Sequence, residues 1–335
     1  MIKAKILTIT VNQEQTCFAI GTTCGFRVFG MENGWFRERF SRTLGGGVGI
    51  IELFHKSNML SFVGGGTTPA YDTKKVIIWD DYQGKPFGVL EYPTEVRGIK
   101  IQKEYLFVAV DRKVYVYNFK DLHPLYQYTT GMNGKGIIGV SVFEKKRIVV
   151  PGQNEGCVKI VDLETQAEKE FQAHVHSLSA LTCAPDGKTV VTASAQGTLI
   201  RVWDLETTRQ IIEFRRGQGQ ADVFSMNFSP NSDLLVTTSN RGTVHIYGIG
   251  EQQECYSRPS RLSALMKDNG LYSKCECTME SGVLSVVFFY CTQIQFINVI
   301  GITQNGMFYK YILSKKEDKP LLTLEEKSPL DQVLR

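Results

Sequence analysis

The chain has 335 residues, of which 42% are hydrophobic and 21% charged, a composition that supports a packed core and excludes an intrinsically disordered protein. Its formal net charge of +4 is too small for a dedicated nucleic-acid-binding protein, which usually carries a denser basic face. A chain of this length forms either two average domains or one large all-β domain.

A unit of roughly 40 residues recurs along the chain, with the spacing expected of propeller blades. Each copy contains short strands separated by Gly, Asn or Asp turns, such as Pro185-Asp186-Gly187. The copies occupy residues 6–31, 50–81, 96–119, 138–164, 176–214, 223–249 and 284–313. Small antiparallel sheets stacked radially explain this repeat, whereas a sandwich or a barrel does not. The sequence therefore predicts an all-β, WD40-like β-propeller with seven four-stranded antiparallel blades.

Two segments interrupt this rhythm and a third follows it. Residues 65–75 lengthen the second copy. A stretch of roughly 30 residues, at about 251–280, stands in the sixth copy where a hairpin loop needs two to five, so we expect a functional or disordered loop there. The propeller is expected to cover residues 1–313, and the charged residues 314–335 are expected to form a fraying tail.

The cysteines give no indication of a metal site. Eight of them are scattered along the chain, and with no secretory signal ahead of them they predict reduced thiols in the cytosol. Cys275 and Cys277 are too close together for a zinc pair, and no second pair accompanies them. The longest apolar run, at 283–302, is interrupted by polar residues and predicts buried strands rather than a membrane-spanning helix. We expect no metal and no cofactor.

The most informative residues are the consecutive arginines of Phe214-Arg215-Arg216-Gly217, between the fifth and sixth copies. In an extended segment, successive side chains point to opposite sides. Arg215 and Arg216 would then anchor two separate anion sites, one on each side. Guanidinium suits phosphate because it is always charged and donates bidentate hydrogen bonds.

A similar polar set flanks this pair on both sides. The fifth copy supplies His174, Ser194, Thr198 and Arg201, and the sixth supplies Ser239, Arg241, Thr243 and His245. Two interpretations remain open at this point. The residues form two phosphate sites, or they form hydrogen-bond networks and inter-blade salt bridges that merely hold the blades together.

The chain resembles the PROPPIN family, which are β-propellers that bind polyphosphoinositides and act in autophagy and endolysosomal membrane traffic. The resemblance covers about residues 1–313 and rests on the Phe-Arg-Arg-Gly signature at 214–217 and on the segments 62–66, 75–81, 194–204 and 239–249. It implies two binding sites for phosphatidylinositol 3-phosphate and phosphatidylinositol 3,5-bisphosphate. Site 1 would comprise His174, Ser194, Thr198, Arg201 and Arg215, and site 2 would comprise Arg216, Ser239, Thr243 and His245.

The resemblance also implies that the sixth-blade loop inserts into the bilayer. Within it, Leu262, Leu265 and Met266 follow helical spacing beside Arg261, which is the pattern of a short amphipathic segment. Family members recruit a large lipid-transfer protein partly through the second blade, where residues 69–74 of this chain depart from the family pattern.

The function expected from the sequence is that of a non-enzymatic membrane effector. It would be monomeric in solution, would bind no nucleic acid, and would work with autophagy or lipid-transfer proteins. It would be cytoplasmic and peripheral on autophagosomal precursor, endosomal or vacuolar/lysosomal membranes. No nucleophile–base pair or phosphate-cradling loop indicates catalysis. The alternative is a WD-repeat scaffold that binds proteins and no lipid.

Overall fold

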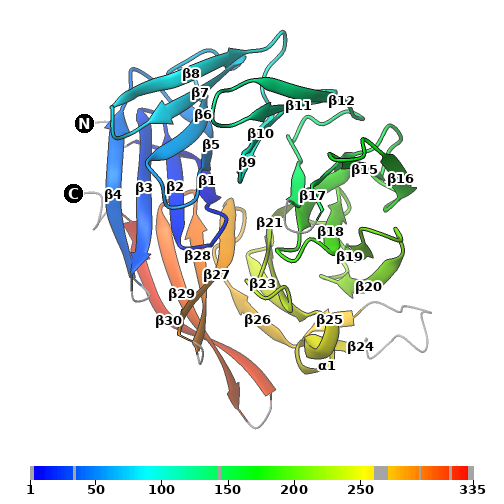
Figure 1. Ribbon diagram of the computed structural model, residues 1–335. Coiled ribbons are helices and arrows are strands. Elements are labelled where there is room, and N and C mark those ends of the chain that lie inside the picture. Colours follow the sequence, from blue (N-terminus) through cyan, green and yellow to red (C-terminus); the bar gives the residue numbers. More distant parts are fainter. Residues whose placement is uncertain are drawn as a thin grey trace. The chain divides into compact units, whose positions relative to one another are not determined.

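The computed structural model describes residues 4–32, 35–141, 145–259, 271–293, 296–316 and 319–330. These residues form seven sheets, each containing four antiparallel strands that make one blade (Figure 1). The sheets are the blades of a seven-bladed β-propeller, which confirms the predicted fold class and blade count. The chain divides into two compact units, Met1–Ile138 and Gly139–Thr303, each with short C-terminal additions.

The first unit holds blades 1 to 3. Blade 1 is formed by β1 (Ile6–Val11), β2 (Cys17–Thr22), β3 (Gly25–Glu32) and β4 (Trp35–Thr43). Blade 2 is formed by β5 (Val48–Leu53), β6 (Met59–Gly64), β7 (Lys75–Asp80) and β8 (Lys85–Glu91). Blade 3 is formed by β9 (Gly98–Gln102), β10 (Tyr105–Ala109), β11 (Lys113–Asn118) and β12 (Pro124–Thr129).

The second unit holds blades 4 to 7. Blade 4 is formed by β13 (Gly139–Ser141), β14 (Arg147–Pro151), β15 (Cys157–Asp162) and β16 (Glu168–Gln172), and blade 5 by β17 (Leu178–Cys183), β18 (Thr189–Ser194), β19 (Leu199–Asp204) and β20 (Gln210–Arg215). Blade 6 is formed by β21 (Val223–Phe228), β22 (Leu234–Ser239), β23 (Thr243–Gly248) and β26 (Cys275–Thr278). Blade 7 is formed by β27 (Ser285–Gln293), β28 (Phe296–Thr303), β29 (Met307–Lys316) and β30 (Lys319–Pro329).

The burial of each strand follows its place in its blade. Middle strands such as β14 and β22 are buried at every residue, because neighbouring strands and blades cover both their faces. The outermost strand β8 alternates exposed and half-buried residues, as expected of a strand with one face in solvent. Within each unit the first strands of successive blades contact one another, which packs the blades side by side.

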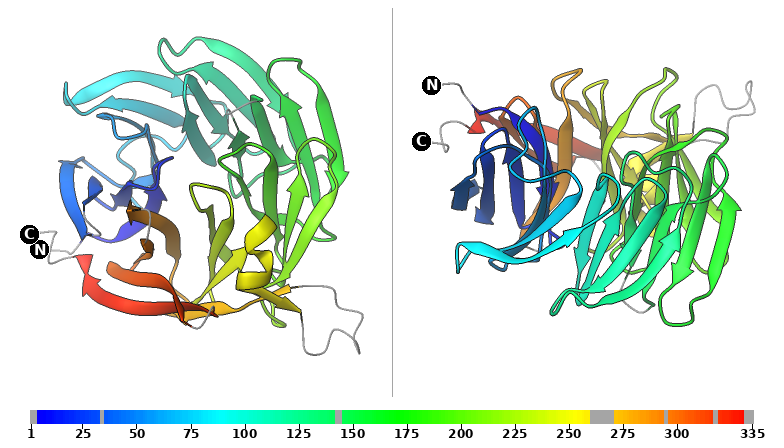
Figure 2. Two further views of the ribbon diagram at one scale, coloured as in Figure 1. Left: turned by 60° about the horizontal axis from the view of Figure 1, so that its bottom comes forward. Right: turned by 90° about the horizontal axis from the view of Figure 1, so that it is seen from above.

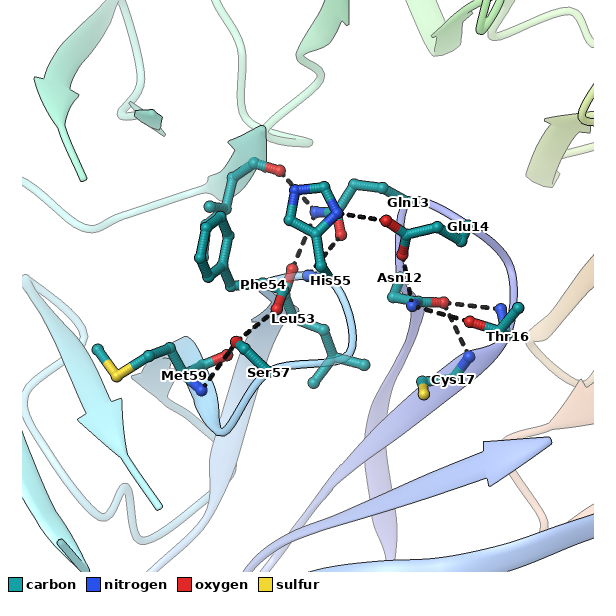
Figure 3. Close-up of polar contacts among 11 residues, drawn as sticks. Asn12, Gln13, Glu14, Thr16, Cys17, Leu53, Phe54, His55, Ser57 and Met59 are labelled. Carbon is teal, nitrogen blue, oxygen red and sulfur yellow. Dashed lines mark hydrogen bonds and ion pairs between the residues drawn. The ribbon is translucent and has the colours of Figure 1, made fainter. Parts of the chain in front are cut away.

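A single side chain links the three blades of the first unit (Figure 3). Gln13, in the loop after β1, donates from Nε2 to the carbonyl oxygens of Leu53 at 2.9 Å and Ile101 at 2.6 Å. Its Oε1 accepts the backbone amide of His55 at 2.9 Å. His55 also contacts the Glu14 carboxylate through Nδ1. These bonds join loops of blades 1 and 2 to a strand of blade 3.

The second-blade insertion is ordered against its own blade. Gly47 donates to the carbonyl of Thr68 at 2.8 Å, and its own carbonyl accepts the amide of Ala70 at 2.9 Å. A Cβ at Gly64 would lie 1.8 Å from the carbonyl oxygen of Tyr71, so the close approach of this loop requires glycine at that position.

The segment that the sequence assigns to a tail belongs in large part to the last blade. β29 extends to Lys316, and β30 runs beside it as the outer strand (red in Figure 2). Leu322 and Leu330 are buried, and Lys310 pairs with Glu325 at 2.7 Å. The boundary therefore differs from residue 313, because β30 buries Pro320 and Leu322 on one face, whereas Leu321 and Leu324 stay exposed.

The sixth-blade loop also contains more regular structure than expected. It begins with η1 (Gly250–Gln252) and α1 (Gln253–Tyr256), and β24 (Ser257–Pro259) then pairs with β25 (Leu271–Ser273). β25 runs parallel to β20, so the base of this loop adds two strands to the edge of blade 5. No helix in the described part of the chain is long and apolar enough to cross a membrane.

Candidate functional site

The two arginines lie at the end of β20, within the second unit. Arg215 is the last residue of β20 and pairs with Leu199 of β19. The backbone amide of Arg216 donates to the carbonyl of Thr198 at 2.9 Å, so the edge pairing continues through both residues. Arg215 is half-buried, whereas Arg216 is 8% exposed. The extended backbone on which the two-site interpretation depends is therefore present.

The Arg216 guanidinium is held by backbone carbonyls of the loops around it. Nε donates to the carbonyl of Gly197 and Nη2 to that of Gly219, each at 2.6 Å. Arg241 reaches the same segment and donates to the carbonyl of Gln220 at 2.8 Å. Burial lowers the pKa of Arg216, and the Arg241 charge lowers it further. Two cations thus lie close enough to repel each other, and an anion beside both would relieve that repulsion.

Blade 6 presents buried polar groups to the same place. The pairing of Thr237 with His245 puts both side chains on one face of the sheet, together with Tyr247. This face packs against β20, because the rings of Tyr247 and Phe214 stack at 4.5 Å. The Arg216 charge lowers the pKa of Tyr247, although burial raises it more strongly. Arg216 and the Thr237 face therefore line one boundary between blades 5 and 6.

Several of these buried groups have no hydrogen-bond partner in the described part of the chain: Thr237 Oγ1, Tyr247 OH and His245 Nε2. His245 has one ionic contact, from Nδ1 to Glu276 at 3.4 Å, and this contact lowers the pKa of Glu276. A buried polar atom without a partner costs free energy. The cluster is therefore suited to a bound polar ligand or to ordered water.

The remaining site 2 residues form the turn above this cluster. Gly242, with φ +72°, closes the turn by donating to the carbonyl of Ser239 at 2.9 Å. Thr243 then opens β23. The fifth blade repeats this construction, with Gly197 at φ +62° donating to Ser194 at 2.8 Å, followed by Thr198. The duplication seen in the sequence thus corresponds to two turns of the same build.

The side chains of His174 and Arg201 at site 1 are engaged within the protein. His174 Nε2 lies 2.9 Å from Thr192 Oγ1, which also accepts the indole N–H of Trp203 at 2.9 Å. Burial lowers the pKa of His174 to about 4, so its ring is neutral near pH 7. Arg201 donates to Glu213 at 2.8 Å and to the carbonyl of Ala173 at 2.6 Å. These contacts are of the kind that hold a blade together.

The corresponding network in blade 6 is incomplete. Thr192 pairs with Arg201 and Thr237 pairs with His245, so Arg201 and His245 occupy equivalent positions in their blades. Thr192 is hydrogen-bonded by His174 and Trp203, whereas Thr237 has no such partner among the described residues. Sequence reasoning missed Thr237 and Tyr247, although their alignment with Thr192 and Trp203 could have identified them.

The base of the sixth-blade loop lies beside Arg215. Arg215 pairs with Tyr272 of β25, and Tyr272 pairs in turn with Arg258 of β24. Laterally paired residues share one face of a sheet, so a tyrosine separates two arginines in one row. The short strands 257–259 and 271–273 gave no periodic signal in the sequence. The expected membrane-insertion residues, Arg261, Leu262, Leu265 and Met266, lie outside the described residues.

No group of three His, Cys, Asp or Glu side chains in the described ranges could hold a metal ion.

Comparisons with known proteins identify the family of this seven-bladed β-propeller. The family model described as PROPPIN matches residues 6–276, and the chain belongs to this family. An SVP1-like protein 2 from Neurospora crassa is 34% identical over 249 residues, which are 74% of this chain and 57% of the relative. The autophagy-related protein 18e of Arabidopsis thaliana is 32% identical over 72% of this chain and 66% of its own length. The chain thus spans less than two thirds of these two relatives.

Solved structures show the same fold along nearly the whole chain. Kluyveromyces lactis Hsv2 has a TM-score of 0.78 at 18% identity and covers 98% of this chain and 100% of its own. A structure described as the complex of KlAtg21 with the coiled coil of AgAtg16 has a TM-score of 0.79 at 17% identity, with 98% and 100% coverage. At these identities the likeness concerns the fold alone.

Proposed function

We propose that this protein is a peripheral membrane effector that binds phosphatidylinositol 3-phosphate and phosphatidylinositol 3,5-bisphosphate at sites 1 and 2. Membership of the PROPPIN family supports the ligand class. The observation that carries the proposal is the boundary at Arg216, where two guanidinium groups lie beside three buried polar atoms that have no partner among the described residues.

Site 2 is the stronger of the two proposed sites. A phosphate beside Arg216 and Arg241 would receive charge-assisted hydrogen bonds, and it would reduce the repulsion that lowers the pKa of Arg216. To bind it, Arg216 would exchange its carbonyl partners at Gly197 and Gly219 for phosphate oxygens. The hydroxyls of Ser239 and Thr243 lie on the turn above and would complete the rim.

At the proposed site 1, some residues would contact the phosphate and others would hold the rim in place. Arg215 would supply the charge, and Ser194 and Thr198 would supply hydroxyls from the turn that matches the site 2 turn. Arg201 and His174 are already held by Glu213 and Thr192. For these two residues we therefore propose a supporting role that fixes the rim, with Arg201 adding positive potential to the site.

Two sites on one rigid body explain how weak headgroup binding becomes stable membrane attachment. After one lipid binds, the second site meets lipids at a high effective concentration, so overall affinity exceeds that of either site. Insertion of the loop carrying Leu262, Leu265 and Met266 would bury apolar surface, which would stabilise the attachment by about 25 cal/mol for each Å² buried. This loop is part of the proposal on the strength of its sequence pattern.

The proposed cellular role is that of an effector in autophagy and endolysosomal membrane traffic. Relatives carry the name autophagy-related protein 18, and a protein of the same fold is described in complex with a coiled coil. We propose partners of that kind or lipid-transfer proteins, and attachment to autophagosomal precursor, endosomal or vacuolar/lysosomal membranes.

The test is flotation with liposomes that contain phosphatidylinositol 3-phosphate, the 3,5-bisphosphate, or neither. The native protein is compared with Arg215→Thr, Arg216→Thr and the double variant. Arg209→Thr is the matched control, since Arg209 is an exposed arginine near the opposite end of the β19–β20 hairpin. Each single change is expected to reduce lipid-dependent flotation and the double change to abolish it. Flotation of the double variant at the native level would favour the protein-binding scaffold instead.

A further inference from the structure

The two matching turns of blades 5 and 6 differ in charge at one position. Residues 194–198 and 239–243 are built alike, since in each a glycine at positive φ donates its amide to the carbonyl of the first residue. The place before that glycine holds Gln196 in blade 5 and Arg241 in blade 6, and both residues are exposed. Equivalent turns thus present a neutral side chain at site 1 and a cation at site 2.

The Arg241 guanidinium lies close to that of Arg216. The two groups donate through Nη2 to the carbonyls of consecutive residues, Arg216 to Gly219 at 2.6 Å and Arg241 to Gln220 at 2.8 Å. In the described part of the chain, both arginines are hydrogen-bonded to carbonyl oxygens only. Neither charge is therefore neutralised by a direct carboxylate contact.

Site 1 holds more negative charge. The Arg201 guanidinium is paired with the Glu213 carboxylate at 2.8 Å. The Glu155 carboxylate accepts the amide of Ser177 at 3.0 Å and its hydroxyl at 2.7 Å. The carbonyl of Ser177 in turn accepts the amide of Ala195, within the site 1 turn, at 2.8 Å. Two carboxylates thus belong to the surroundings of site 1.

The carboxylate in the site 2 cluster is Glu276, which lies 3.4 Å from His245 Nδ1. The hydrogen bond to His245 lowers the pKa of Glu276, and the Arg258 charge lowers it further. Two guanidinium groups therefore stand against one carboxylate at site 2. At site 1, Arg201 and Arg215 stand against two.

We propose that site 2 selects the bisphosphorylated headgroup through Arg241, whereas site 1 does not distinguish the two headgroups. Since this selectivity concerns the lipid sites, it rests on the proposed function. A single phosphate would lie beside both guanidinium groups, whereas the 3- and 5-phosphates of the bisphosphate would each engage one. Both contacts would be charge-assisted hydrogen bonds. Gln196, which occupies the same place at site 1, carries no charge with which to attract a second phosphate.

The experiment is isothermal titration of the full chain with inositol 1,3-bisphosphate and inositol 1,3,5-trisphosphate, the soluble headgroups of the two lipids. Arg215→Thr leaves site 2 to be measured alone, and Arg216→Thr leaves site 1. Site 2 is expected to bind the trisphosphate about tenfold more tightly than the bisphosphate, as one added charge-assisted contact would give. Site 1 is expected to bind the two with similar affinity.

Exchanging the residues of the two turns provides the matched variants. Arg241→Gln, made together with Arg215→Thr, should remove the preference of site 2 for the trisphosphate. Gln196→Arg, made together with Arg216→Thr, should give site 1 a preference that it lacks. Each change introduces a side chain that the matching turn already carries at an exposed position. Far-ultraviolet circular dichroism confirms that each variant is folded.

The titrations separate the selectivity of Arg241 from the proposed function itself. If both sites prefer the trisphosphate equally, or if the preference of site 2 survives Arg241→Gln, the role assigned to Arg241 is wrong and the lipid-binding function stands. If neither headgroup binds the native chain, the proposed function is wrong and the selectivity with it.

Discussion

At the residue scale, the candidate site between blades 5 and 6 combines two guanidinium groups with buried hydroxyls that have no hydrogen-bond partner among the described residues. Arg215 and Arg216 stood out in the sequence as two consecutive arginines in a segment expected to be extended, although such a pair could equally form inter-blade salt bridges. Thr237 and Tyr247 were not recognised, since a threonine and an aromatic residue in a strand resemble ordinary β-sheet residues. Their importance follows only from the packing of blade 6 on β20, which leaves their hydroxyls buried.

The unpartnered hydroxyl of Tyr247 leads to a stability prediction. Removing a buried hydroxyl that has no partner relieves a desolvation cost, so Tyr247→Phe should raise the free energy of unfolding by about 1 kcal/mol. Tyr311→Phe is the matched control, because the Tyr311 hydroxyl donates to the carbonyl of Thr278 at 3.0 Å and its loss should cost about 1 kcal/mol. Urea unfolding measures both. Equal destabilisation by the two changes would show that ordered water already satisfies Tyr247.

His174 predicts a pH dependence of stability. Burial, assisted by the Arg201 charge, lowers its pKa to about 4, whereas an unfolded histidine titrates near pH 6.5. Between these values the unfolded chain binds a proton that the folded chain excludes. The free energy of unfolding therefore falls as the pH drops from about 6.5 to about 4, by up to about 3 kcal/mol.

The measurement is urea unfolding at several pH values of the native protein, His174→Gln and the exposed control His123→Gln. Glutamine can keep the bond to Thr192 but does not titrate. The stability advantage of the native protein over His174→Gln should shrink between pH 7 and pH 4.5. A difference as constant as that of the His123 control would mean that His174 does not titrate on unfolding.

At the scale of elements, the strands of the seven repeats were predictable from the sequence. The outer strand β30 and the β24–β25 hairpin of the sixth-blade loop were not. Seven repeats with regular turns identified the blades, because alternation and turn residues act locally. β30 was read as tail because charged residues are frequent in it and only one of its three leucines, Leu322, is buried. The β24–β25 hairpin was missed since strands of three residues carry no period, and only their pairing with β20 defines them.

The place of β30 in blade 7 predicts the effect of truncation. Ending the chain at residue 313 would remove β30, expose the surface that covers Leu322 and Leu330, and leave Lys310 without Glu325. Burial of each leucine contributes about 1.5–3 kcal/mol, so we expect a loss of several kcal/mol or failure to fold. Ending the chain at residue 330 should have no effect. Thermal unfolding of both truncated chains checks this, and native stability of the shorter chain would restore the tail interpretation.

At the scale of the whole molecule, we propose that one propeller holds two lipids. The arginine pair, the two matching turns and the base of the sixth-blade loop all belong to the second unit. Repeating one turn in adjacent blades would give the two proposed sites a fixed spacing, and attachment to a membrane would then depend on the lipid density in the leaflet. The blade count followed from the repeat, whereas the unequal engagement of the residues proposed for the two sites could be recognised only from the side-chain contacts.

The most direct test of this account is the stoichiometry of headgroup binding in solution. Isothermal titration with the soluble headgroup inositol 1,3-bisphosphate avoids the membrane and therefore counts sites without avidity. The account predicts two headgroups per native chain, one for Arg215→Thr, one for Arg216→Thr and none for the double variant. A single headgroup per native chain, or two that survive the double change, would contradict the two-site mechanism.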